Sequence, residues 1–158
     1  MTGIPSSNHV ESDHAPMAAR TQSFTTLARF AWVSPCSALG FLLALPVLAG
    51  GGSARRVAGV LEVAVRRGCL PERTLLRRLP FAAITLGHVV VGVSTADLDR
   101  LRAHEHAHVR QYERWGAAFL LAYPFASLIA LLRGGHPYRN NRFEREAHLA
   151  AEKRENAA

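Results

Sequence analysis

The sequence predicts an α+β fold that is mostly α-helical and carries an N-terminal membrane anchor. Three observations support this prediction. Apolar residues recur at helical spacing before Gly116 and again before Lys153, whereas Ala82–Val93 is rich in β-branched residues. Two long apolar blocks, Ala31–Gly52 and Gly116–Leu132, interrupt the polar pattern. The chain of 158 residues is long enough for one compact domain.

The N-terminal region divides into two parts. Residues 1–28 are polar and lack periodicity, so we expect them to be disordered. Residues 29–52 form the expected anchor, because Ala31–Gly52 has no charged residue and a bilayer span needs about 20 apolar residues. Pro35 and Pro46 weaken this block as a regular helix. A cleavable signal peptide is the alternative, but no clean cleavage site follows the block.

The chain is basic, with a formal net charge of +7. Arginine pairs such as Arg55-Arg56 lie beside apolar stretches, which suits an anionic membrane surface. Nucleic acid is less favoured, because no aromatic interleaving accompanies the pairs, and a merely solvated basic face is a further alternative. More basic residues follow the anchor than precede it, so we expect the catalytic side to face the cytoplasm.

Residues 53–158 are expected to form one domain. The spacing of apolar residues in Arg55–Arg67 predicts an amphipathic helix, and Pro71–Leu79 predicts a short one. Ala82–Val93 predicts a β-hairpin or one bent strand around Gly87-His88. The two cysteines, Cys36 and Cys69, have no CxxC partner, so we expect both to be unpaired.

The second half of the chain contains the clearest helix signals. Ser94-Thr95-Ala96-Asp97 is a helix start and Gly116 a natural stop, which predicts a helix of about 20 residues. Gly116–Leu132 is apolar all round and contains Pro124. After a loop over Arg133–Arg139, Asn141 to about Lys153 predicts a final amphipathic helix.

The first of these helices contains the motif H-E-x-x-H, from His104 to His108. Residues four apart share one helix face, so the two imidazoles can bind one zinc ion (Zn²⁺) at about 2.0–2.1 Å. Glu105 is turned by about 100° from His104, which suits a catalytic base that reaches a zinc-bound water without being a ligand. His106 points away, onto a face that we expect to be a charged exterior.

The run HEHAHVRQYERWG, followed some tens of residues later by NRFEREA, resembles the gluzincin metallopeptidases. The likeness is to their small or membrane-bound bacterial branches and covers roughly Ile84–Ala151. It implies that Glu144 is the third zinc ligand. The alternatives are a capping box in which Asn141 is the N-cap and Glu144 has no metal role, or Glu146 as the ligand.

The resemblance also bears on the surroundings of the zinc. Relatives carry an aspartate that orients the first histidine, at the position that His148 occupies here, so this outer support is altered. Candidates for the oxyanion donor are Tyr138, His136 and Arg142. An edge strand before the zinc helix is expected to bind the substrate as an added strand, and Ile84–Val91 occupies that place. We expect His88 to be a hydrogen-bonded turn residue.

The segment Gly116–Leu132 presents a topological constraint. As a helix it would be about 25 Å long, shorter than a hydrocarbon core of about 30 Å. A single crossing would place His104 and Glu144 on opposite sides of the bilayer. We therefore expect this segment to pack as a core or interfacial helix against the zinc helix.

The sequence thus predicts a membrane-associated, zinc-dependent peptidase that acts on a peptide or protein substrate. One alternative is a regulatory or scaffold protein that binds zinc without peptidase activity. The other is a basic module that binds a membrane surface or nucleic acid.

Overall fold

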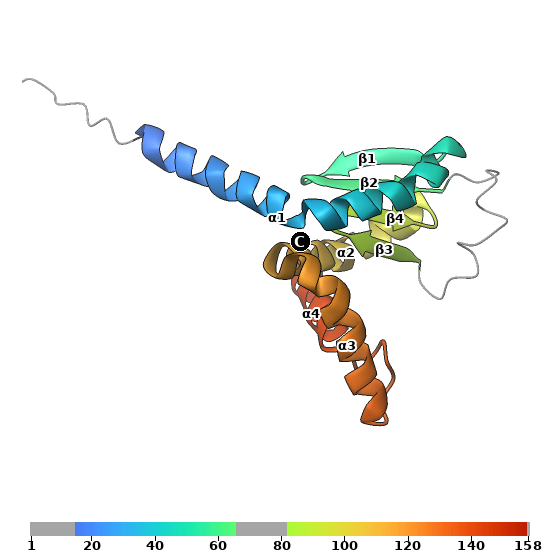
Figure 1. Ribbon diagram of the computed structural model, residues 1–158. Coiled ribbons are helices and arrows are strands. Elements are labelled where there is room, and N and C mark those ends of the chain that lie inside the picture. Colours follow the sequence, from blue (N-terminus) through green and yellow to red (C-terminus); the bar gives the residue numbers. More distant parts are fainter. Residues whose placement is uncertain (1–14, 66–81, 158) are drawn as a thin grey trace, which may run out of the picture.

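The computed structural model describes residues 15–65 and 82–157, and only the backbone of residues 15–29 (Figure 1). It confirms the mostly helical α+β class. The expected helix Pro71–Leu79, residues Arg66-Arg67 and Cys69 lie outside the described residues. The elements are α1 (Ala15–Ala49), β1 (Ser53–Val57), β2 (Val60–Ala64), β3 (Ala83–Leu86), β4 (Val89–Gly92), α2 (Thr95–Trp115), the 3-10 turn η3 (Gly116–Ala118), α3 (Phe119–Leu132) and α4 (Arg142–Glu155).

The four strands form one sheet in the order β1-β2-β4-β3, with β2 and β4 parallel and the other pairs antiparallel. Side chains alternate between its two faces. Val63 and Val91 pack with Ala44 and Val47 of α1, whereas Val90 packs on the opposite face with residues of α2. The sheet therefore lies between α1 and α2 (Figure 1). The β3–β4 hairpin is confirmed, and β3 is an edge strand.

The amphipathic helix predicted for Arg55–Arg67 is wrong. Its described part forms the hairpin β1–β2, which turns through Ala58 and Gly59 with φ values of 49° and 84°. Positive φ at both turn residues matches the right-handed twist of hairpin strands. The β-branched Val57, Val60 and Val63 favour strands, and a run this short satisfies helical and strand periods equally well.

Helix α1 is continuous through Pro35 and Pro46 and is part of the core. A Cβ atom at Gly40 would lie 2.7 Å from the carbonyl oxygen of Leu86, so this glycine lets the helix contact the β3–β4 turn. Ser37 Oγ accepts the backbone N–H of His88 at 3.0 Å, which makes His88 a hydrogen-bonded turn residue as expected. The buried residues follow one face of the helix: Val33, Cys36, Gly40, Ala44 and Val47.

The other face of α1 is apolar and exposed, as shown by Trp32, Leu42 and Leu45. Phe30–Ala49 is long and apolar enough to cross a membrane by length and composition, as is the stretch Thr95–Leu132. The helix begins at Ala15, within the region expected to be disordered. Extending a helix that is already nucleated adds one hydrogen bond per residue, and Ala, Met, Arg and Gln in this stretch are good helix formers. Cys36 is buried and unpaired, as expected.

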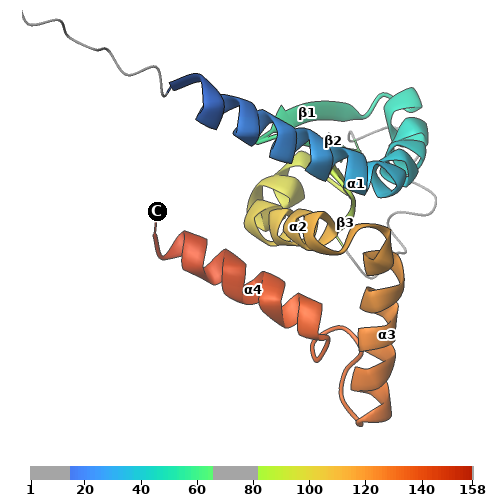
Figure 2. The ribbon, with the colours of Figure 1, turned by 60° about the vertical axis from the view of Figure 1, so that its left-hand side comes forward.

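Helix α2 has the predicted limits. Ser94 Oγ accepts the N–H of Asp97 at 3.1 Å, and Gly116 ends the helix with a φ of 56°. Helix α3 runs through Pro124 without a break, and Figure 2 shows it projecting from the body of the protein. Its first residue, Phe119, packs on Tyr112 of α2 with ring centroids 4.6 Å apart. The start of α3 therefore packs against α2 as expected, whereas most of its large apolar residues further along are exposed.

The far face of α2 is only in part the expected charged exterior. Arg110 and Arg114 are exposed, but the part around His106 packs on the sheet. His106 is buried, and its Nε2 lies 3.3 Å from Oε1 of Glu62 on β2. The Glu62 carboxylate is 2% exposed and accepts hydrogen bonds from Arg55 Nε at 2.7 Å and Arg102 Nε at 2.9 Å. This network joins β1, β2 and α2 through one buried carboxylate.

The Glu62 network predicts a pH-dependent stability. Burial alone would raise the pKa of Glu62, but hydrogen bonds from Arg102 and Arg55 outweigh it and hold the pKa below its ordinary value. The pKa of Glu62 is lower in the folded state than in the unfolded state. The ion pairs therefore stabilise the fold at pH values above the ordinary glutamate pKa, and this stabilisation is lost as the pH falls through the folded-state pKa. Glu62→Gln should lower the free energy of unfolding at neutral pH by about 2 kcal/mol.

Urea unfolding at several pH values measures this effect. The gap between wild type and Glu62→Gln should narrow below about pH 4. The exposed Glu152→Gln is the matched control and should change stability by less than about 0.5 kcal/mol. A gap that is independent of pH would contradict the role given to the carboxylate charge.

Candidate metal centre

Two helices supply the side chains of the candidate centre. His104 and His108 lie one turn apart on α2, and Glu144 lies in the first turn of α4, which packs along α2 (Figure 2). Asn141 fixes where α4 begins: its Oδ1 accepts the N–H of Phe143 at 2.8 Å. Its Nδ2 donates to the carbonyl oxygen of Tyr123 at 3.1 Å, which ties the start of α4 to α3.

The ligand atoms converge on one point. The Nε2 atoms of His104 and His108 are 3.1 Å apart, and each lies close to one oxygen of Glu144, at 3.3 and 3.2 Å respectively. All three residues are buried. Ligands of a tetrahedral zinc ion at about 2.0–2.1 Å are about 3.3 Å apart, so these separations suit such an ion. The structure thus brings together the three residues predicted to hold zinc.

A hydrogen-bond chain sets the tautomer of His108. The Nε2 of Gln111 donates to the carbonyl oxygen of Phe143 at 3.0 Å, so its Oε1 is the acceptor on the other side of the amide. The Nδ1–H of His108 donates to this oxygen at 2.8 Å. In a neutral imidazole the lone pair is then on Nε2, which faces the cluster. Gln111 lies one turn beyond His108, but the sequence did not reveal this role.

Gln111 provides a test of this arrangement. Gln111→Ala removes the acceptor of His108 Nδ1–H, and the loss of such outer partners weakens metal binding by about 10–100-fold. Gln111→Glu keeps an acceptor oxygen and should retain most of the zinc affinity while losing the hydrogen bond to Phe143. Zinc titration against a fluorescent competitor measures both variants. Equal affinity of Gln111→Ala and wild type would contradict this role.

His104 has no such partner. Its Nδ1 and the Oε2 of Glu144 are buried and lack a hydrogen-bond partner within residues 15–65 and 82–157. His148 contacts the His104 ring with centroids 4.6 Å apart and planes tilted by 48°. A buried carboxylate oxygen without a hydrogen donor is costly unless a cation satisfies it. The orphaned Oε2, which lies next to His104 Nε2, therefore fits a metal ligand.

The charges of the cluster agree with this donor set. Burial would raise the pKa of Glu144, but His104, His108 and Tyr123 outweigh it and hold the pKa far below its ordinary value. Burial would lower the pKa of His108, but Glu144 raises it above its ordinary value. An ionised carboxylate facing two imidazole nitrogens is a suitable donor set for a divalent cation.

Glu105 lies beside this cluster and not within it. It is buried, and its Oε2 accepts a hydrogen bond from Thr85 Oγ1 on the edge strand β3 at 2.6 Å. Tyr123 of α3 donates to Oε1 of Glu144 at 2.6 Å. The sequence indicated neither Thr85 nor Tyr123, because both reach the centre through long-range packing. Their only local signal is a polar group within an apolar strand or helix.

The candidates for the oxyanion donor, and the alternative ligand Glu146, lie in different surroundings. Tyr138 lies near Glu144, and burial together with the Glu144 carboxylate raises the pKa of its phenol. His136 is a loop residue whose Nδ1 accepts the N–H of Tyr138 at 3.2 Å. The Arg142 guanidinium lies over the Phe143 ring, 4.7 Å from its centroid, and Glu146 interacts with Arg114 at 3.3 Å. Tyr138 is therefore the oxyanion candidate that stands closest to the cluster.

The capping-box alternative for Glu144 is not what the structure shows. Asn141 caps α4, but the backbone N–H of Asn141 donates to the carbonyl oxygen of Tyr138. The Glu144 carboxylate faces Tyr123 and the two histidines instead. Comparison of the chain with protein-family models, with curated proteins and with solved structures finds no match.

Proposed function

We propose that this protein is a membrane-associated, zinc-dependent peptidase of the gluzincin type. The observation that carries the proposal is the convergence of His104, His108 and Glu144 with Glu105 beside them. When bound, zinc would lower the pKa of a coordinated water toward 7 and polarise a carbonyl group. His104, His108 and Glu144 would hold the ion.

Residues of the protein supply the general base, the groups that position it and the metal ligand, and the oxyanion donor. Glu105 accepts the proton of the attacking water, and its carboxylate is held by the Thr85 hydroxyl at 2.6 Å. Tyr123 donates to Glu144 and keeps that carboxylate in place. Tyr138 is the hydrogen-bond donor for the carbonyl oxygen of the substrate. Within the described part of the chain, no strand pairs with the outer edge of β3 beside Thr85, where an extended peptide adds as a strand.

Membrane association is supported by the exposed apolar face of α1. Its opposite face is in the core, so we propose that α1 lies in the membrane surface with the domain attached, and does not span the bilayer away from it. The cytoplasmic side remains our proposal for the active site, from the excess of arginine after residue 52.

Metal analysis of the purified protein tests the proposal directly. We expect about one zinc per chain, and hydrolysis of an unfolded protein substrate that a chelator abolishes and added zinc restores. Zinc without turnover on any of a broad set of peptides would favour the second candidate, a zinc-binding regulatory protein. The lack of a partner for His104 Nδ1 among the described residues supports that candidate. Absence of zinc would favour a basic membrane-surface or nucleic-acid binding module.

A further inference from the structure

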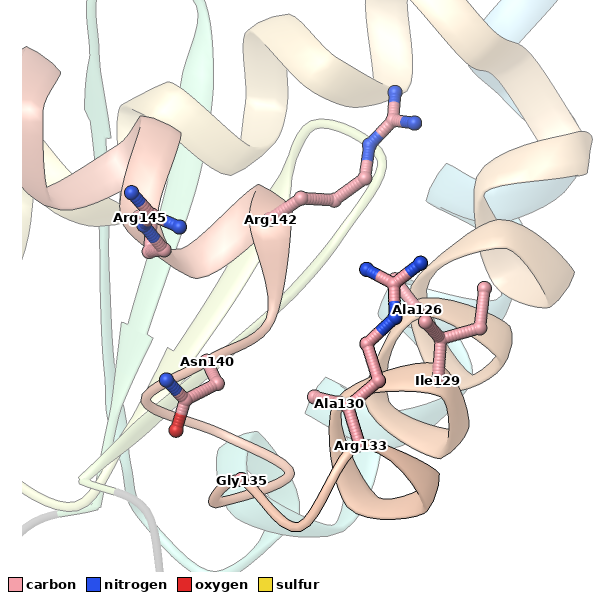
Figure 3. A pocket seen from close by; sticks show the side chains of 8 residues that line it. All are labelled: Ala126, Ile129, Ala130, Arg133, Gly135, Asn140, Arg142 and Arg145. Carbon is pink, nitrogen blue, oxygen red and sulfur yellow. The ribbon is translucent and has the colours of Figure 1, made fainter.

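A cleft of about 450 Å³ lies outside the candidate metal centre, between the end of α3 and the start of α4 (Figure 3). It combines two kinds of surface. Ala126, Ile129 and Ala130 of α3 form an apolar wall, and the loop residues Gly135 and Asn140 close one end. Three arginines, whose guanidinium groups point in different directions in Figure 3, line the rest: Arg133, Arg142 and Arg145.

What distinguishes these three arginines is that they line one cleft. Arg100 and Arg114, which are also exposed, each interact with a carboxylate, whereas other exposed arginines such as Arg56 and Arg139 have no carboxylate partner among the described residues. Within the described part of the chain, no carboxylate lies in ion-pair distance of the three arginines in the cleft. Three positive charges around one cleft repel one another, and an anion between them would relieve this repulsion. A phosphate group matches the guanidinium fork.

The apolar wall continues outside the cleft. Helix α3 buries Phe119, Ala126 and Ala130 but leaves most of its other large apolar residues in solvent, and Leu132 next to Arg133 is 77% exposed. The exposed residues run along the helix: Leu121, Phe125, Leu128, Leu131 and Leu132. An exposed apolar ridge that ends at a cleft lined by arginines without a carboxylate partner matches a ligand with an anionic head and an apolar tail.

We propose that this cleft binds the headgroup phosphate of an anionic phospholipid, with the acyl chains along the exposed side of α3. The projecting α3 then lies in the membrane interface together with α1. This inference rests on the membrane association in the proposed function, but it is independent of the metal centre. An acidic protein partner without an apolar surface is disfavoured, because it would leave the apolar ridge of α3 uncovered.

Vesicle co-sedimentation of the full chain tests the proposal. The probes are phosphatidylcholine vesicles with and without about one-third phosphatidylglycerol. The test variant replaces Arg133, Arg142 and Arg145 by Gln, and the matched control replaces Arg100, Arg114 and Lys153 by Gln, with the same loss of charge. Each basic group near an anionic surface contributes about fivefold to partitioning, so the test variant should lose about a hundredfold in affinity for the anionic vesicles. The control should lose less than about fivefold.

Three outcomes of these experiments would contradict binding of a phospholipid headgroup in the cleft. Equal losses in the test and control variants would overturn the proposal, because net charge alone would then account for binding. Equal binding of wild type to both vesicles would also overturn it. Soluble glycerol phosphate that binds the protein as tightly as the anionic vesicles do would show a site for free phosphate compounds instead. The test variant should contain as much zinc as wild type does, so failure of this proposal is separable from failure of the peptidase proposal.

Discussion

Glu105→Gln protein is expected to retain its zinc and to lose peptide hydrolysis, whereas His104→Ala or His108→Ala protein is expected to lose the zinc itself. The carboxylate of Glu105 lies outside the group of atoms that can share one ion, so its replacement removes a base and not a ligand. General-base catalysis contributes about 10²–10⁴-fold to such rates, which sets the expected loss of turnover. Zinc content and hydrolysis rate, measured on the same preparations, check the expectations for the Glu105 variant and for the histidine variants.

Thr85 gives this experiment an internal control. Thr85→Val removes the hydroxyl that holds Glu105 and should lower turnover less than Glu105→Gln does, with zinc unchanged. Thr85→Ser restores the hydroxyl and should recover most of the activity. Equal zinc loss in the Glu105 and histidine variants would refute the division of roles, as would full activity of Glu105→Gln.

Glu144→Gln should weaken zinc binding more than about a hundredfold, beyond the effect of losing an outer partner. The reason is geometric: both oxygens of Glu144 face the histidine Nε2 atoms, at 3.2 and 3.3 Å. Zinc titration in the presence of a calibrated competitor measures the affinity.

Glu146→Gln is the matched control for this change. Glu146 lies on the same helix, contacts Arg114 and accepts a hydrogen bond from Gln111 Nε2 at 3.3 Å. The amide oxygen of a glutamine can keep this acceptor role, so the variant should bind zinc as wild type does. If Glu144→Gln loses thermal stability while its zinc affinity is untouched, Glu144 is a structural residue and the centre has no third ligand from α4.

Local signals in the sequence explain the success of the prediction for α2. A capping serine, a terminal glycine and one apolar face all lie within this helix, and their effect does not depend on the rest of the chain. The pairing of the two histidines follows from helix geometry alone. The proximity of Glu144 came from the family resemblance, because nothing local specifies how α4 lies on α2.

The features that the sequence did not predict all depend on long-range contacts. A glutamate such as Glu62 is ordinarily expected to face solvent. Here Arg55 and Arg102 both form ion pairs with its carboxylate, so this side chain can be buried. Strands β2 and β4 pair in parallel although β3 lies between them in the sequence. No local sequence pattern encodes this pairing. Thr85 and Tyr123 reach the centre only through such packing.

The placement of α1 has a consequence for biosynthesis. This helix leaves the ribosome before the strands and helices that cover its buried face, and its apolar stretch is long enough to be recognised as a membrane span. If a translocation machinery inserted it across the bilayer, Val33, Cys36, Ala44 and Val47 would be withdrawn from the two clusters that they complete. The order of synthesis therefore sets a competition between insertion and folding. Gly40 and Ser37, which dock the helix on the β3–β4 turn, favour folding once that hairpin has been made.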